Sequence, residues 1–484
     1  MKNKRNTENE ITSAGKRKRT RRITKIRKRW VALIISLFVF GALLIAAVVF
    51  SLYMNGNVFG DIGLQSETVY ILSVLLCLLP VLLLSIFLVL MFVKNKEKVI
   101  KADVVLEGSI AASGASRTGE EADSRGERFC MLSEIDRNRS KYGNKKYGRG
   151  IDLEELCESF RNYAASQLKL YYDIEDIRRF IAGMSVSHIL ILQGMSGTGK
   201  TSLAYAYGSF IGNSSTVIPV QPMWKERTDL VGYYNEFTKR FNETLLLEKM
   251  YEANYSKDMY ITVLDEMNIA RVEYYFAEFL SLLELPNKDE RYLDVVSDRW
   301  ATDPKQFKDG RIKLPSNMWF IGTANNDDST FAISDKVYDR AMILNLDSKS
   351  ERFAAPRTEK ISISAEQFES LVEDALREYE ISKRNQKRLE ELDKYLIEHF
   401  HITFGNRIMK QIKTYIPVYI ACGGDELDAL DDILSKKVMR KLETQNPIYL
   451  RNSAEGLISY MEELFGVDKM KLCRDYIRRI ERNA

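Results

Sequence analysis

Histidine and cysteine are scarce in this sequence. Its 484 residues include three histidines, at positions 188, 399 and 401, and five cysteines. The cysteines form no CxxC pair, and no HExxH motif is present. A zinc site needs three or four such ligands at characteristic spacings, so a zinc centre and histidine-based catalysis are both disfavoured. We interpret the cysteines as reduced, structural residues of a cytosolic compartment.

Acidic residues are nearly missing from the first 29 residues, which hold 13 Lys or Arg against only Glu8 and Glu10. The whole chain carries a net charge of +4, so the remainder is net negative. The basicity therefore belongs to one tail, residues 1–29. We interpret this tail as a topology determinant and an anchor to anionic lipid, and contact with nucleic acid is the alternative left open.

Charged residues are also missing from two long apolar segments, residues 30–50 and 68–93. Each is longer than the roughly 20 residues that cross a bilayer core. A cleaved signal peptide has a shorter apolar part and is not followed by a second span. Lys and Arg flank the outer ends of both segments, whereas the loop between them has none. The pattern predicts a two-span hairpin over residues 30–93 in the cell membrane, with both termini cytoplasmic.

The composition changes again after the second apolar segment. Residues 104–128 are rich in Ala, Ser, Gly, Glu and Arg without apolar periodicity, and we assign residues 94–150 to a flexible tether. Apolar, strand-like runs then alternate with helical patterns, which predicts an α/β fold with a parallel sheet flanked by helices. Helical periodicity dominates after the last run. We therefore expect a nucleotide-binding domain over 151–350 and an all-helical lid with further helices over 351–484.

A phosphate-binding loop is the strongest motif in the chain. The sequence GMSGTGKT at 194–201 fits GxxxxGK[ST] and directly follows the apolar run 188–193. A strand that leads into a glycine-rich turn and then a helix presents backbone N–H groups to the phosphates of a nucleotide. The residues expected to bind ATP here are Gly194, Ser196, Gly197, Thr198, Gly199, Lys200, Thr201 and Ser202.

Two further apolar runs end in polar residues. The run 260–264 is followed by Asp265 and Glu266, and the run 318–321 leads to Asn325. In P-loop ATPases the first acid belongs to the Mg²⁺ shell and the second is the general base for the attacking water. The carboxyl ends of parallel strands face one crevice, so Asn325 is expected to contact the γ-phosphate or that water. Thr201 and Asp265 are the predicted Mg²⁺ ligands.

Together these elements resemble the AAA+ ATPases, and the resemblance spans residues 173–443. The segment LDEMNIA at 264–270 resembles the form of the second motif found in the McrB-type restriction, MoxR and dynein-related ATPases. Residues 229–241 resemble the hairpin that these proteins insert after the second strand. The resemblance implies that Lys200, Glu266, Asn325 and Arg340 are catalytic, with Arg340 as an arginine finger that acts on a neighbouring subunit. It also implies that Arg407, at the start of a lid helix, is a second nucleotide sensor.

The same resemblance implies a homo-oligomer, a hexameric ring, that hydrolyses ATP. The chain lacks the amino-terminal DNA-reading domain of the restriction ATPases, which leaves direct nucleic-acid binding open. Our leading hypothesis is a membrane-anchored ATPase that remodels or translocates a macromolecular partner on the cytoplasmic face. A nuclease subunit of an McrBC-like defence system is one candidate partner. The alternatives are a MoxR-like chaperone and a membrane scaffold that uses ATP binding as an assembly switch.

Overall fold

The computed structural model describes residues 126–143, 145–148, 150–325, 330–347 and 350–483. The predicted basic tail, the membrane hairpin and the first part of the tether lie outside the described residues. Within these described ranges, no helix combines the length and the apolar character needed to cross a membrane.

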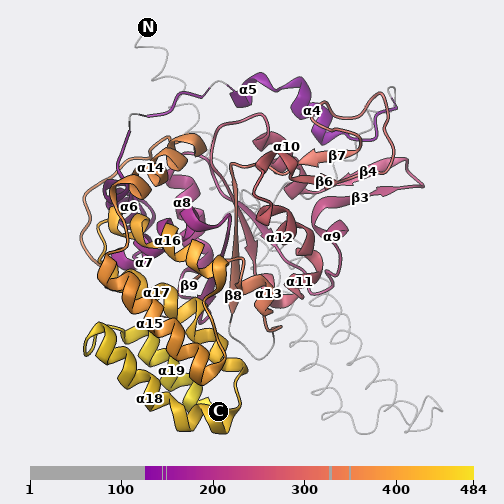
Figure 1. The fold of residues 1–484 in the computed structure, drawn as a ribbon. Helices are drawn as coiled ribbons and strands as arrows, with labels where there is room; N and C mark the ends of the chain where they lie inside the picture. The colour runs from indigo at the N-terminus through magenta and orange to yellow at the C-terminus, as the bar shows by residue number, and fades with distance from the viewer. Residues whose placement is uncertain (1–125, 144, 149, 326–329, 348–349, 484) are drawn as a thin grey trace, which may run out of the picture. The chain divides into compact units, whose positions relative to one another are not determined.

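A five-stranded sheet forms the centre of the predicted nucleotide-binding domain, with the strand order β2-β5-β8-β1-β9. Figure 1 labels two of its strands, β8 and β9. All four strand pairs are parallel, as the sequence predicted. The apolar runs correspond to β1 (Ile189–Gly194), β2 (Thr216–Pro219), β5 (Tyr260–Asp265), β8 (Met318–Asn325) and β9 (Met342–Asn345). The phosphate-loop strand β1 therefore lies between β8 and β9.

Both faces of this sheet are buried. Along β1, Ile189 and Ile191 belong to one apolar cluster, whereas Leu190 and Leu192 belong to another. Side chains alternate between the two faces of a strand, so a strand covered on both sides has an uninterrupted apolar sequence. The helices around the sheet include α6 (Leu153–Tyr163), the π-helical turn η2 (Ala164–Leu168), α7 (Ile174–Val186), α8 (Lys200–Phe210), α10 (Leu245–Ala253), α12 (Ala277–Glu284) and α13 (Asp335–Tyr338).

Two β-hairpins project from this core. The first, β3–β4, occupies the place in the chain where the sequence predicted an inserted hairpin, and the second, β6–β7, precedes β8. Their strands are β3 (Gly232–Asn235), β4 (Arg240–Glu243), β6 (Tyr292–Asp294) and β7 (Arg311–Lys313). Short helices connect these parts, namely α9 (Arg227–Val231), η3 (Met267–Ile269), α11 (Val272–Tyr275) and η4 (Lys288–Glu290).

The structure differs from the sequence assignment in the last part of the tether. Residues assigned to the tether form α4 (Met131–Arg137) and α5 (Ser140–Gly143). The ring of Phe129 is fully buried and stacks on Phe241 of β4. The Glu243 carboxylate accepts hydrogen bonds from the first three backbone N–H groups of this turn, those of residues 130–132. The folded region thus begins before residue 130, because its packing partners lie more than 100 residues later in the chain.

Arg128 joins this amino-terminal segment to the second hairpin. Its side chain is only 1% exposed, and its guanidinium donates two hydrogen bonds of 2.7 Å to the carboxylate of Asp303 and one of 2.7 Å to Asp298. The Trp300 ring lies over the same guanidinium, 4.6 Å away. Arg128 therefore holds the loop between β6 and β7 against the first described segment, residues 126–143.

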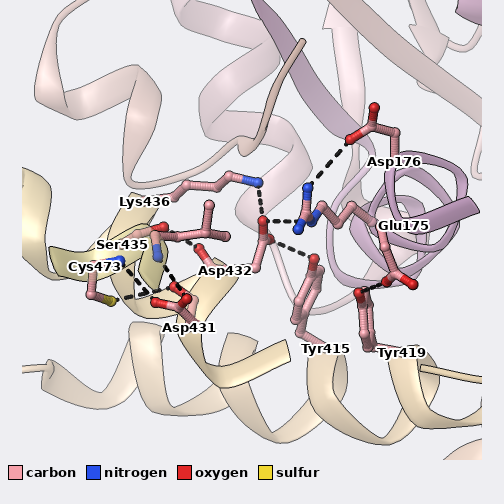
Figure 2. A network of polar contacts seen from close by, with 11 residues as sticks. Glu175, Asp176, Tyr415, Tyr419, Asp431, Asp432, Ser435, Lys436 and Cys473 are labelled. Atoms are coloured by element: carbon pink, nitrogen blue, oxygen red, sulfur yellow. Dashed lines mark hydrogen bonds and ion pairs between the residues drawn. The ribbon is translucent and has the colours of Figure 1, made fainter. Parts of the chain in front are cut away.

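From residue 365 onward the described chain is mainly helical, as the periodicity predicted. They are α14 (Ala365–Glu378), α15 (Lys383–Phe400), α16 (Gly405–Ala421), α17 (Glu426–Lys437), η5 (Met439–Thr444), α18 (Pro447–Phe465) and α19 (Lys471–Asn483). A buried polar network connects α16 and α17 to α7 (Figure 2). Its centre is Asp432, which accepts hydrogen bonds from Tyr415 and Lys436 and forms an ion pair with Arg179. Since α7 leads directly into β1, this network connects the lid to the phosphate-loop strand.

Candidate nucleotide-binding site

The phosphate loop follows β1 in a backbone conformation that only glycine adopts easily. Gly194 has φ +139°, and a Cβ there would lie 2.2 Å from the carbonyl oxygen of Leu346. Gly199 has φ +94° and caps the start of α8. Between them, Met195, Ser196 and Gly197 are exposed. The backbone of this loop is therefore accessible to an anionic ligand at a helix N-terminus.

Lys200 lies beneath the loop rather than in solvent. Its side chain is 6% exposed, and its ammonium donates hydrogen bonds to the carbonyls of Gly194 at 3.0 Å and Met195 at 2.7 Å. Thr198 donates a further hydrogen bond to the Met195 carbonyl at 3.0 Å. These contacts fix the curvature of the loop and hold a positive charge at its centre. Ser202 lies partly buried in the first turn of α8.

The two predicted Mg²⁺ ligands are in contact. The Thr201 hydroxyl donates a hydrogen bond to Oδ1 of Asp265 at 2.7 Å, and the Thr323 hydroxyl donates to the same oxygen at 2.8 Å. Thr323 also accepts a hydrogen bond from the backbone N–H of Glu266 at 2.9 Å. Thr323 on β8 therefore positions both acidic residues of β5.

Glu266 has a strained backbone. Its φ of +52° and ψ of +45° are left-handed values, which are unfavourable for a residue with a Cβ. Strain of this kind persists only where the surrounding structure enforces it, and it is frequent at functional sites. The Glu266 side chain is exposed at the carboxyl end of β5.

Asn325 lies level with the phosphate loop. The register of β1 and β8 places it opposite Gly194. Asn268, which is buried, donates hydrogen bonds to the Asn325 carbonyl at 2.9 Å and the Thr330 hydroxyl at 3.0 Å. The structure thus brings Asn325 to the same edge of the sheet as Asp265 and the loop.

This arrangement fits a nucleotide with its metal ion. An exposed glycine loop with a lysine at its centre matches the needs of a polyphosphate, and a hydroxyl and a carboxylate are oxygen ligands of the kind that Mg²⁺ prefers. On the other side of the loop, the buried hydroxyl of Tyr172 donates to the Gly199 carbonyl at 3.1 Å, and burial raises the pKa of this tyrosine.

Arg340 and Arg407 are not part of this cluster. The Arg340 carbonyl accepts a hydrogen bond from the Ser187 hydroxyl at 2.9 Å, and Ser187 precedes β1. Arg340 therefore lies at the amino end of the sheet, and the phosphate loop lies at the carboxyl end, roughly 20 Å of strand away. Arg407 forms an ion pair of 2.7 Å with Glu284, and Arg340 forms one of 2.6 Å with the same residue. The resemblance implies that Arg407 contacts the nucleotide, and in this structure its side chain shares the partner Glu284 with Arg340.

Helices α16 and α17 hold the chain around Arg340. Lys437 is 4% exposed, and its ammonium donates hydrogen bonds to the carbonyls of Tyr338 and Ala341. Burial lowers the pKa of Lys437 to about 7. Gln411 donates a hydrogen bond to the Asp339 carbonyl at 3.1 Å. The backbone on both sides of Arg340 is therefore fixed by lid residues.

Sequence reasoning missed three residues of this arrangement: Thr323, Asn268 and Glu284. Thr323 stands two residues before Asn325, and Asn268 stands two residues after Glu266. Their closeness to these predicted site residues could have indicated that both belong to the site. No sequence signal pointed to Glu284, because a glutamate at the end of a helix is usually a solvated residue.

Comparison with a family model agrees with this geometry. Residues 189–341 match the family model described as AAA domain (dynein-related subfamily), and residues 359–484 match a domain of unknown function (DUF8727). Among curated proteins no similar sequence is found. A solved structure of a full-length MCM homolog from Methanopyrus kandleri aligns with probability 1.00, a TM-score of 0.33 and 11% identity, over 59% of this chain and 60% of that chain. Residues 189–341 are thus similar to the AAA domain of the dynein-related subfamily, which supports a P-loop ATPase fold for this region.

Proposed function

We propose that this protein is an oligomeric, Mg²⁺-dependent ATPase whose active site is completed by a neighbouring subunit. The proposal is supported above all by the separation between Arg340 and the phosphate loop of the same chain. The Thr201–Asp265–Thr323 cluster, Glu266 and Asn325 lie at one end of the sheet, and Arg340 lies at the other. A ring in which each subunit offers its amino edge to the loop of the next would bring the two parts together.

The geometry supports the following proposed roles. Lys200 and the backbone N–H groups of the loop bind the phosphates, and Thr201 and Asp265 would hold Mg²⁺, which neutralises charge on the phosphate oxygens. Glu266 accepts the proton of the attacking water as general base, with its backbone N–H bound to Thr323. Asn325 orients that water or the γ-phosphate. Arg340 of the neighbour stabilises the negative charge that develops in the transition state.

We further propose that hydrolysis drives the remodelling or movement of a macromolecular partner on the cytoplasmic face of a membrane. The two apolar segments within residues 30–93 support the anchor, and the polar network between α7 and α17 supports coupling between lid and loop. A nuclease subunit and a protein substrate are the two candidate partners. A hexamer is the expected assembly.

The test is turnover of ATP and of GTP against protein concentration, with the full-length chain. Wild type is compared with Glu266→Gln and Arg340→Ala. We expect turnover of ATP that rises cooperatively with concentration and is abolished by either substitution, while Glu266→Gln still binds ATP. ATP binding without turnover at every concentration would instead support a scaffold that uses ATP as an assembly switch.

A further inference from the structure

One carboxylate connects the two arginines that the sequence singled out. Glu284 is the last residue of α12, and its Oε2 lies 2.6 Å from Nε of Arg340 while its Oε1 lies 2.7 Å from Nη2 of Arg407. The three side chains are 30%, 25% and 50% exposed, in the order Glu284, Arg340, Arg407. They form a surface cluster that another subunit can reach.

This cluster lies away from the nucleotide site of its own chain. Arg340 is fixed beside Ser187 at the amino end of β1, and Arg407 is fixed to Arg340 through Glu284. In this conformation neither guanidinium is near the phosphate loop of the same subunit. Any phosphate that they contact together belongs to another subunit.

Charge explains why a carboxylate is needed between them. Two guanidinium groups held a few ångströms apart repel each other, and a carboxylate between them offsets that repulsion. Arg407 is half exposed, so without Glu284 it would turn into solvent. With Glu284 present, the three side chains carry one net positive charge, and the two guanidinium groups are held at a fixed spacing.

A backbone contact also links helix α16 to the residues around Arg340. Gln411 stands one helical turn after Arg407 on α16 and donates to the Asp339 carbonyl, directly before Arg340. Helix α16 is therefore linked to residues 339–340 in two ways. Gln411 bonds directly to Asp339, and Arg407 shares the carboxylate of Glu284 with Arg340. The lid and the finger segment form one unit at this edge.

We propose that Glu284 is a positioning residue that holds Arg340 and Arg407 as a pair, so that both arginines of one subunit address the nucleotide of its neighbour. The inference rests on the proposed function, because it requires an oligomer with Arg340 acting between subunits. It assigns Arg407 to the neighbour's nucleotide rather than to its own.

Mixing of two full-length variants, one without turnover and one with reduced turnover, tests where Arg407 acts. Glu266→Gln subunits lack the general base but carry both arginines, whereas Arg407→Ala subunits keep the base. If Arg407 acts on the neighbour, the mixture recovers ATP turnover well above that of either variant alone. If Arg407 acts on its own nucleotide, neither kind of site is complete in any mixture, and the absence of recovery overturns the inference. A mixture of Arg340→Ala with Glu266→Gln shows that mixed assemblies form.

The role of Glu284 is tested by Glu284→Ala and by Glu284→Gln, which keeps the side-chain shape. We expect each to lower kcat about tenfold or more without changing the Kd for ATP, and to have no further effect in the Arg407→Ala background. The control is Glu278→Ala, on the same helix, which removes an ion pair of 2.8 Å with Arg227. Glu284 would be only structural if its replacement left kcat unchanged. The same conclusion would follow if the double variant lost kcat by the product of the two single losses. Wild-type turnover that does not depend on concentration would instead refute the oligomeric function itself.

Discussion

The hydroxyl of Thr201 donates a hydrogen bond of 2.7 Å to the carboxylate of Asp265, 64 residues later in the chain. Thr323 donates to the same carboxylate oxygen from a third segment. Partners that orient a metal ligand in this way typically contribute 10- to 100-fold to metal affinity or activity. We therefore expect Thr323→Val to lower ATP turnover by about that factor and to raise the Mg²⁺ concentration needed for half-maximal turnover.

The matched control for this substitution is Thr262→Val on β5. Thr262 is buried, and among the described residues its hydroxyl has no hydrogen-bond partner. Its replacement should leave the Mg²⁺ dependence unchanged. An equal loss in both variants would mean that the effect of Thr323→Val comes from general destabilisation.

The left-handed backbone of Glu266 predicts a conflict between stability and activity. Glycine adopts φ near +52° without the Cβ penalty of roughly 1 kcal/mol. Glu266→Gly should therefore raise the free energy of unfolding by up to about 1 kcal/mol while it abolishes turnover. Glu266→Gln should abolish turnover without that gain. Urea unfolding of both variants measures the difference, and equal stabilities would contradict the strain argument.

Lys437 predicts a pH dependence of stability. Burial lowers its pKa from 10.5 in the unfolded chain to about 7 in the folded protein. Between these values the unfolded chain binds a proton that the folded protein has released, so the folded state gains stability as the pH rises from 7 towards 10.5. This group contributes up to about 1.4 kcal/mol per pH unit there. Lys437→Met should remove this slope.

The measurement is urea unfolding at pH 7 and pH 9 for wild type, Lys437→Met and a control, Lys410→Met. Lys410 is exposed on α16, so its removal should leave the slope as in wild type. Lys437→Met will be less stable at both pH values, because two carbonyls lose their donor. The test is therefore the change in unfolding free energy between pH 7 and pH 9. If this change is the same in Lys437→Met as in wild type, Lys437 keeps an ordinary pKa.

The buried contacts of Arg128 predict that the segment around it stabilises the fold. Arg128→Met leaves the nearly buried carboxylate of Asp303 without its cation, which we expect to cost about 3 kcal/mol of unfolding free energy. Arg137→Met, on the same segment, removes a loose and exposed ion pair of 3.6 Å and should cost less than about 0.5 kcal/mol. A chain that starts at residue 150 should unfold at lower urea concentration than one that starts at residue 120.

Much of the candidate nucleotide site was predictable because its signals are local. The apolar runs that became β1, β5 and β8 are continuous, since both faces of each strand are buried, and each motif directly follows or ends its strand. The parallel topology then brings Asp265 and Asn325 to the phosphate loop. Local periodicity likewise sufficed for the helices after residue 365.

The rest depends on contacts that the sequence does not display. Arg128 stands in a stretch of Ser, Gly, Glu and Arg, and its burial is decided by carboxylates at least 170 residues away. The place of Arg407 depends on Glu284, 123 positions earlier, and its motif alone indicated only the start of a lid helix. Ion pairs between distant segments require the fold before they can be predicted.

The contacts of Arg128 determine how a pulling force on the amino-terminal side of the chain is transmitted. Within the described residues, tension applied from the amino-terminal side reaches this guanidinium close to the first described residue, where two carboxylates and the Trp300 ring resist it. The force then passes into the loop between β6 and β7 and, through Phe129, into β4, rather than into the central sheet. Pulling on the amino terminus should therefore displace the two hairpins before it disturbs the phosphate loop.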